Sequence, residues 1–186
     1  FSHKNVAAVI PSLKIEKPQK FIEKLQWYEY VMCSFLRNSM SKLNALIMTH
    51  GVFSVYRREV LLKIGGFDES NLTEDFEIAL RLHKHKYNIK MENTSVGYTK
   101  APENFRDLIK QRERWARGYI QNGIKYKEML FNKKYGSLGT LHLPLTLLSA
   151  LLFIIITFLV LFKFIHGTFD SFLDIFIIKT DLLKLI

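Results

Sequence analysis

Residues 70–85 read SNLTEDFEIALRLHKH and place two adjacent acids, Glu74 and Asp75, at the start of a predicted helix. Thr73 stands at the capping position, and apolar residues follow at helical spacing. Exposed backbone N–H groups and the helix dipole favour an ionised carboxylate in this first turn. Asp75 is therefore a candidate general base, although acids in a first turn commonly do no more than complement the dipole.

The rest of this predicted helix has one face that is expected to be buried. That face carries Phe76, Ala79, Leu80 and His83. The two histidines of the HKH run, His83 and His85, are two positions apart and point to different faces of a helix. This spacing predicts surface positions rather than metal ligands.

A second polar motif, QRERW, lies in a helix predicted from the Asn104 cap to about Met129. Gln111, Arg114 and Trp115 stand at i, i+3 and i+4, and therefore project from one helical face. An amide, a guanidinium and an indole could together bind a phosphate and stack on a sugar. The alternative is a surface helix with one buried tryptophan and solvated arginines.

The N-terminal part of the chain predicts a strand and a helix. Residues 5–15, NVAAVIPSLKI, form a β-branched run with a proline at its middle, which favours an edge strand or two short strands. From residue 19 to about 41, apolar side chains recur at spacings of three and four and predict one buried stripe. The stripe consists of Phe21, Leu25, Tyr28, Met32 and Phe35.

Further elements alternate along the chain. The patterns predict a strand at 52–56, a helix at 58–64 and short strands at 87–91 and 95–98. Alternating helices and strands are typical of an α/β fold.

The last third of the chain predicts a membrane region. No formally charged side chain occurs from 135 to 162, and this run reaches about 42 Å as a helix, which is enough for a ~30 Å hydrocarbon core. We expect a span at about 138–162, and an interfacial helix or a second span at about 169–186. Lysines crowd the side before the span, which places residues 1–134 in the cytoplasm.

Charge follows the same division. The net charge of +10 lies within residues 1–134, because three lysines and three aspartates balance beyond them. Such an excess suits nucleic acid, an anionic membrane surface or a phosphate-rich substrate. The single cysteine, Cys33, excludes an internal disulfide framework and fits a reducing compartment.

Two longer stretches resemble the processive family 2 glycosyltransferases, which include cellulose, hyaluronan and poly-N-acetylglucosamine synthases. GVFSVYRREVLLKIGGFDESNLTED at 51–75 resembles the segment that ends in the family's TED motif. APENFRDLIKQRERWARG at 101–118 is similar to the approach to its QxxRW motif, and a membrane span follows. The match covers nearly the whole chain. It implies the C-terminal part of a GT-A-type, Rossmann-like α/β domain at residues 1–134, followed by a membrane region at 135–186.

The resemblance also implies roles for individual residues. Asp75 would remove the proton from an acceptor hydroxyl, with Glu74 beside it at the substrate opening. The QxxRW residues Gln111, Arg114 and Trp115 would support the donor diphosphate and the acceptor end. Weaker acceptor-site candidates follow from the family's pre-acceptor segment and are His50, Gly51 and Phe53.

The implied reaction moves a hexose or N-acetylhexosamine from a nucleotide sugar to a growing polysaccharide at the plasma membrane, with inversion at the anomeric carbon. Relatives hold a divalent metal, Mg or Mn, through an upstream DxD motif. No DxD occurs in these residues, so the metal ligands and most nucleotide contacts are expected outside this chain, and the chain alone is expected to be inactive.

Two alternatives remain open from the sequence. The acceptor could be a membrane lipid that receives one sugar per encounter. The chain could instead be a membrane-tethered protein that binds anionic lipid or RNA through its basic surface. We expect no nucleic acid partner, because the aromatic residues follow helical stripes and no RNA-binding signature is present.

Overall fold

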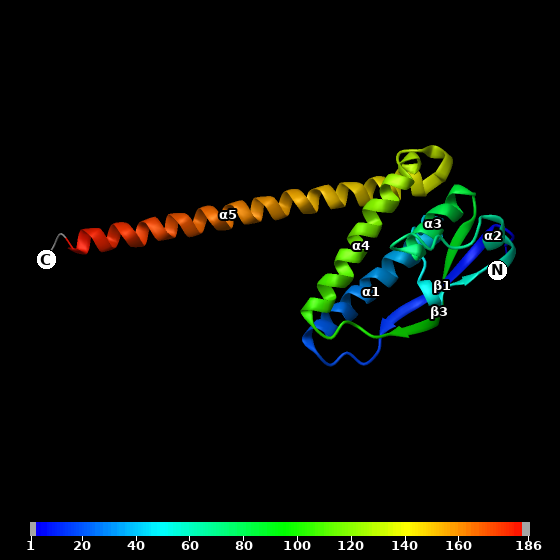
Figure 1. The fold of residues 1–186 in the computed structure, drawn as a ribbon, viewed down its shortest axis with the longest axis horizontal. Coiled ribbons are helices and arrows are strands. Elements are labelled where there is room, and N and C mark those ends of the chain that lie inside the picture. The colour runs from blue at the N-terminus through cyan, green and yellow to red at the C-terminus, as the bar shows by residue number, and fades with distance from the viewer. Residues whose placement is uncertain (1–2, 184–186) are drawn as a thin grey trace. The chain divides into compact units, whose positions relative to one another are not determined.

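The computed structural model describes the backbone of residues 3–183 and the side chains of residues 3–168. The chain forms two compact units, Phe1–Pro144 and Leu145–Ile186. The longer elements, in chain order, are β1 (Val6–Ile15), α1 (Phe21–Lys42), β2 (Val55–Tyr56), α2 (Arg58–Lys63), α3 (Glu74–Lys84), β3 (Asn88–Thr99), α4 (Phe105–Lys125) and α5 (Leu143–Leu183). Short helical turns lie at Gly51–Phe53, Lys127–Met129, Lys133–Tyr135 and Leu138–His142. Figure 1 shows α1, α3 and α4 packed around the sheet.

The described sheet has three strands in the order β2-β1-β3. β1 runs parallel to β3 and antiparallel to β2, so the prediction of an edge strand or two short strands at 5–15 is wrong. Pro11 is tolerated in this central strand because β2 pairs only with Ala8 and Val9. Pro11 therefore faces β3 alone, next to an irregularity in the register, and its missing N–H breaks no ladder on the other side.

The two short strands predicted at 87–91 and 95–98 form one strand, β3. The interruption nevertheless has a structural counterpart. Pro11 pairs with Glu92, whereas the next residue, Ser12, pairs with Val96. Three residues of β3 therefore bulge out of the ladder without ending the strand.

The main core lies where the sheet meets α2 and α3. Its buried members are Ala7, Ala8, Ile10, Leu46, Val60, Ile64, Ile78, Ala79, Leu82 and Ile89. Consecutive residues of β1 are buried, because helices and loops cover both of its faces. A second cluster joins the start of α3 to the segment after α4 and contains Ala45, Phe76, Leu80, Tyr126, Met129 and Leu138.

His83 belongs to the buried face of α3, so the prediction of a surface position is wrong for this residue, whereas His85 is exposed. The Nε2 of His83 donates to the carbonyl oxygen of Leu46 at 2.6 Å. Burial lowers the pKa of His83 to about 4 and keeps the ring neutral. Helical spacing had already placed it beside Phe76, Ala79 and Leu80.

The apolar stripe of α1 is exposed, which contradicts the predicted burial. The exposed fractions are Phe21 75%, Leu25 52%, Tyr28 64%, Met32 60% and Phe35 67%. α1 turns polar side chains toward the sheet and α4 instead: Gln26 is buried, and the Ser41 hydroxyl accepts from Met91 N at 2.9 Å. Periodicity identifies an apolar face but does not say which side of the helix meets the core.

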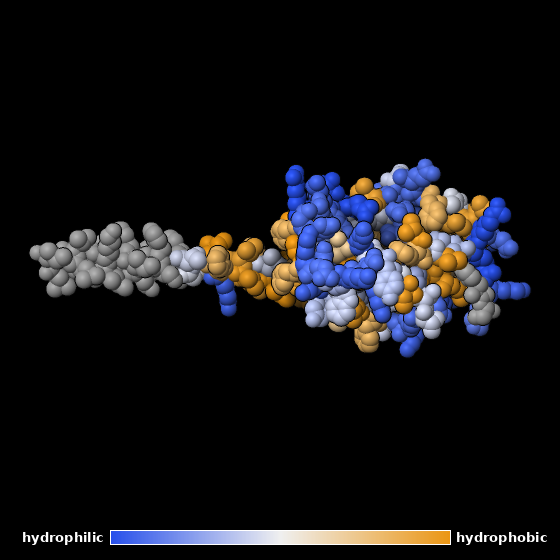
Figure 2. All heavy atoms as spheres, turned by 90° about the horizontal axis from the view of Figure 1, so that it is seen from below, coloured by the Kyte–Doolittle hydropathy of each residue, from blue (hydrophilic) through white to orange (hydrophobic). Residues whose placement is uncertain are grey.

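In the part of the chain that the structure describes, one helical stretch is long and apolar enough to cross a membrane. It covers Leu138–Thr168, and an 18-residue window within it has a mean hydropathy of 2.9. Figure 2 shows hydrophobic surface along the described side chains of α5. The backbone continues as α5 to Leu183, and the side chains of 169–186 lie outside the described residues, so the interfacial helix or second span expected there stays a prediction.

Candidate active site

Asp75 lies in the first turn of α3 and is half-buried, whereas its neighbour Glu74 is exposed. The Phe76 backbone N–H donates to Asp75 Oδ1 at 2.8 Å. The Asp75 main-chain carbonyl accepts from both the N–H and the hydroxyl of Thr49, at 3.2 and 2.8 Å. The hydroxyl of Tyr56 donates to Thr49 Oγ1 at 2.8 Å. These bonds fix the backbone of Asp75 at the start of α3.

Burial raises the pKa of Asp75 above its ordinary value of 3.8, and the nearby Glu74 charge acts in the same direction. Hydrogen bonds from backbone N–H groups and the charge of Arg114 work against this shift of the pKa. The sequence pattern indicated that the helix terminus would favour the anion. In the folded chain desolvation outweighs that effect, which makes Asp75 a stronger base when it is ionised.

Thr73 occupies the N-cap position of α3, but its side chain does not cap the helix. Thr73 is buried and its Oγ1 accepts a hydrogen bond from Asn122 of α4 at 3.1 Å. Directly against it lies Gly118, where an added Cβ would stand 2.3 Å from Thr73 Oγ1 and 2.4 Å from its Cγ2. Only glycine at position 118 allows α4 to approach Thr73 this closely.

Other contacts attach α4 to the start of α3. The rings of Phe76 and Tyr119 stack with centroids 5.3 Å apart and an interplanar angle of 5°. Farther along, the buried carboxylate of Glu77 accepts from Lys125 Nζ at 2.9 Å and from the Tyr126 hydroxyl. The start of α3, which carries Asp75 of the TED motif, therefore lies next to α4, the helix that carries QRERW.

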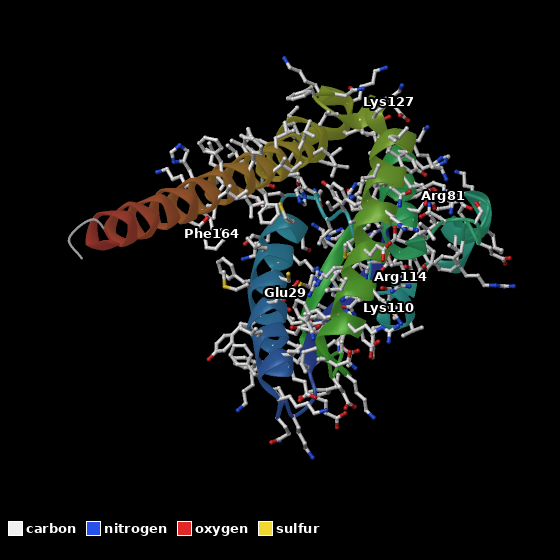
Figure 3. The ribbon with its side chains drawn as sticks, turned by 60° about the vertical axis from the view of Figure 1, so that its left-hand side comes forward. Glu29, Arg81, Lys110, Arg114, Lys127 and Phe164 are labelled. Atoms are coloured by element: carbon white, nitrogen blue, oxygen red, sulfur yellow. The ribbon has the colours of Figure 1, made fainter. Side chains whose placement is uncertain are left out.

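The QRERW side chains have different environments. Gln111 and Trp115 are half-buried, and Arg114 is exposed on α4 (Figure 3). The buried Oε1 of Gln111 accepts no hydrogen bond from the described residues. The charge of Arg114 is close enough to lower the pKa of Asp75. The motif thus combines a buried amide oxygen that has no partner among the described residues with an exposed cation near the Asp75 carboxylate.

Arg112 holds Trp115 from one side. The Arg112 guanidinium carbon lies 4.5 Å from the centroid of the Trp115 ring. Its Nη1 donates to Glu29 Oε1 of α1 at 2.7 Å, and its Nη2 donates to the other carboxylate oxygen. Figure 3 shows Glu29 on α1 and Arg114 on α4. One face of the indole is therefore occupied by protein, and α1 braces it through Glu29.

The segment with the weaker acceptor-site candidates lies beside Asp75, because Thr49 bonds to the Asp75 carbonyl. His50 is buried, and burial together with the charge of Arg37 lowers its pKa to about 3. Gly51 has a φ of +49°, a conformation that favours glycine. Phe53 packs onto the sheet, where an added Cβ at Gly97 would stand 2.9 Å from the Phe53 ring. That packing gives Phe53 a structural role.

The structure thus brings the residues around Asp75 and those of QRERW to adjoining elements. Sequence reasoning missed the residues that hold them there, namely Thr49, Asn71, Arg112 and Asn122. For Asn122 a signal exists, because it continues the stripe that runs through Gln111, Trp115 and Gly118 at spacings of three and four. For Thr49 the contact is long-range and no local pattern indicates it.

Within the described residues, no group of three or more histidine, cysteine, aspartate or glutamate side chains is placed to hold a metal ion. Glu74 and Asp75 are adjacent, but Glu74 is exposed and none of the described residues joins them as a third ligand.

Residues 4–178 match the family model described as glycosyl transferase family group 2. Over 144 residues, the chain is 27% identical to a poly-beta-1,6-N-acetyl-D-glucosamine synthase of Staphylococcus aureus, covering 77% of this chain and 33% of that protein. The corresponding synthase of Staphylococcus epidermidis is 31% identical over 114 residues, covering 61% of this chain and 28% of its own length. The chain therefore spans about a third of the length of these relatives.

A solved structure has a similar fold. It is a mannosyltransferase from Pyrobaculum calidifontis in complex with GDP-Man and Mn2+, which matches with a TM-score of 0.50 and 22% identity. The match covers 68% of this chain and 32% of that one. The mixed α/β unit therefore has a GT-A glycosyltransferase as its structural neighbour.

The contact between Gly118 and Thr73 predicts a specific cost of substitution. Gly118→Ala should lower the free energy of unfolding by about 1–3 kcal/mol, because the new methyl group overlaps a buried, branched side chain. Gly123→Ala in the same helix is the matched control, since an added Cβ there meets no atom within 4 Å. That control should be neutral or up to ~1 kcal/mol more stable.

The thermal midpoints of the two full-length variants, measured on matched membrane preparations, test this difference. Equal midpoints for Gly118→Ala and Gly123→Ala would show that α4 does not approach Thr73 this closely.

Proposed function

The chain belongs to glycosyl transferase family group 2, and from this premise we propose that Asp75 is the base of an inverting sugar transfer at the start of α3. The observation that supports this most strongly is the half-buried Asp75, whose pKa is raised by burial and which adjoins the helix that carries QRERW. A general base needs a pKa shifted toward the working pH and a place at an opening that substrate can reach.

In the proposed step, a hydroxyl oxygen of the acceptor sugar attacks the anomeric carbon of the donor. The hydroxyl proton passes to the Asp75 carboxylate as the new glycosidic bond forms. The bond between the anomeric carbon and the nucleotide diphosphate breaks, and its electron pair leaves with the diphosphate. Attack from the face opposite the leaving group inverts the configuration at that carbon.

The QRERW side chains would serve the two ends of this reaction. Arg114 offers an exposed guanidinium for diphosphate oxygens, and Gln111 offers an amide oxygen that no described group satisfies. Trp115 would stack its second face on the acceptor sugar, since Arg112 covers the first. Glu74 is exposed beside Asp75 and would lie where the substrate enters. His50 and Gly51 follow Thr49, whose hydroxyl bonds to the Asp75 carbonyl, and would therefore lie near the acceptor.

We propose a growing polysaccharide as the acceptor and a nucleotide-activated hexose or N-acetylhexosamine as the donor. The names of the staphylococcal relatives favour N-acetylglucosamine and a polymer product over a lipid acceptor. Family membership also favours sugar transfer over the alternative of a protein that only binds anionic lipid or RNA.

A divalent metal, Mg or Mn, is expected in the complete enzyme, because the structural neighbour is a complex with GDP-Man and Mn2+. The described residues of this chain do not fit such a site, since no three suitable ligands gather among them. We therefore assign no residue of this chain to the metal and derive no step through it. Residues outside this chain would bind it together with most of the nucleotide.

We further propose that residues 1–134 form the cytoplasmic catalytic part and that a span of about 138–162 anchors it in the plasma membrane. The uncharged run and the apolar stretch Leu138–Thr168 support the span. Lys125, Lys127, Lys133 and Lys134 precede it, and cytoplasmic flanks are enriched in such cations.

Replacing the base tests the proposed reaction. In the full-length enzyme, Asp75→Asn keeps the shape of the side chain but removes the proton acceptor, so turnover should fall by on the order of 10²–10⁴-fold while donor binding changes little. Turnover is measured with labelled nucleotide-activated N-acetylglucosamine, glucose and mannose. The control Glu69→Gln changes an exposed carboxylate in the loop before α3 and should keep the wild-type rate.

Near-normal turnover by Asp75→Asn would mean that this residue only complements the helix dipole and is not the base.

The length of the labelled product distinguishes a polysaccharide acceptor from a lipid acceptor, because a polymer grows over successive transfers whereas a lipid acceptor gains one sugar.

The orientation is tested by cysteine labelling in a Cys33→Ser background. A cysteine introduced at the exposed Lys127 should react with a membrane-impermeant reagent only after the cells are permeabilised. Labelling of that cysteine in intact cells would place residues 1–134 on the outer side and refute the proposed topology.

A further inference from the structure

Two buried amide side chains join the loop before α3 to α4. Asn122 of α4 is fully buried, and Asn71 is 8% exposed. Asn71 Nδ2 donates to Asn122 Oδ1 at 2.9 Å, and Asn122 Nδ2 donates back to Asn71 Oδ1 at 3.1 Å. The two amides therefore pair in both directions.

Both amides also bond to Thr73. The second N–H of Asn122 Nδ2 donates to Thr73 Oγ1 at 3.1 Å, and the Thr73 backbone N–H donates to Asn71 Oδ1 at 3.1 Å. Each donor and acceptor of Asn122 thus has a protein partner. Satisfied networks of this kind fix a local geometry, because any shift leaves a buried polar group without a partner.

The network lies between the two motifs. On one side, Thr73 directly precedes Glu74 and Asp75. On the other, Asn122 continues the α4 stripe of Gln111, Trp115 and Gly118. A helix is stiff over this distance, so a fixed position of Asn122 fixes the height and rotation of the whole stripe. Apolar side chains of similar volume would fill the same space and give up this directional constraint.

We propose that Asn122 is a positioning residue, which acts through Asn71 and Thr73 to set the height and rotation of α4 against the first turn of α3. It thereby sets how Gln111, Arg114 and Trp115 are placed relative to Asp75. This inference rests on the proposed function, in which these residues serve one transfer reaction. The absence of a side chain at Gly118 sets how closely α4 can approach Thr73, and the amide hydrogen bonds limit how far the two segments can slide or separate.

The test is the kinetics of Asn122→Ala in the full-length enzyme, per folded molecule and below its thermal midpoint. kcat should fall by about 10-fold or more, because small displacements of reacting groups are costly, whereas the donor KM should stay within about threefold. Asn71→Ala should lower kcat comparably. The double variant should lower kcat little more than either single variant does, because both substitutions break the same amide pair.

Asn93→Ala is the matched control. Asn93 Nδ2 donates to Asn38 Oδ1 at 2.9 Å in an exposed amide pair between β3 and α1. Losing this bond should leave kcat at the wild-type value. If Asn122→Ala does not accumulate, Thr73→Val keeps the shape against Gly118, removes only the hydroxyl acceptor, and should lower kcat by about threefold or more.

The outcomes distinguish the two proposals. If the wild-type enzyme transfers sugar, and Asn122→Ala or Thr73→Val does so at the normal rate per folded molecule, the positioning role is overturned and the proposed function stands. Independent, multiplicative losses from Asn71→Ala and Asn122→Ala would also overturn it. If the wild-type enzyme transfers none of the tested sugars, the proposed function fails and the inference fails with it.

Discussion

The close approach of α4 to Thr73 is the contact on which the rest of the site depends. Gly118 has no side chain, so the helix that carries QRERW can lie against the residue that precedes Glu74 and Asp75. Stacked rings of Phe76 and Tyr119 continue the contact. Beyond them, the buried carboxylate of Glu77 is paired with Arg81 and Lys125 and accepts a hydrogen bond from Tyr126, so that a costly buried charge is compensated. Two motifs separated along the chain become one surface.

The same packing decides the chemistry of Asp75. Partial burial raises the pKa of its carboxyl, whereas hydrogen bonds from the helix amides and the charge of Arg114 lower that pKa by a smaller amount. The backbone of Asp75 is bonded by Thr49, so the residue gains basicity without gaining freedom to move. Base strength and position therefore both come from the elements around the first turn of α3 rather than from the helix terminus alone.

The order of the motifs predicted the family. Spacing within single elements predicted α3, α4 and an apolar segment long enough to span a membrane. Which face of an element meets the core was harder to predict from the sequence. The stripe of α1 was real but exposed, and His83 was buried with the apolar face to which its spacing assigned it. β1 is a central strand despite Pro11, because β2 is too short to reach that residue. Thr49 and Asn71 make contacts across the fold that no local pattern indicates, and the α4 stripe includes Asn122 without identifying its partner.

The most direct test of a single α3–α4 site built around Asp75 is the pH dependence of kcat/KM in the full-length enzyme, which reports the pKa of the free enzyme, compared with the same profile of Asp75→Asn. The proposed base, Asp75, acts only when ionised, so kcat/KM of the wild type should be level at higher pH and fall as the pH drops through a pKa above 3.8. This acid limb should be missing from Asp75→Asn. A wild-type kcat/KM that stays level down to about pH 4, the ordinary range for an aspartate, or an acid limb that is unchanged in Asp75→Asn, would contradict the assignment.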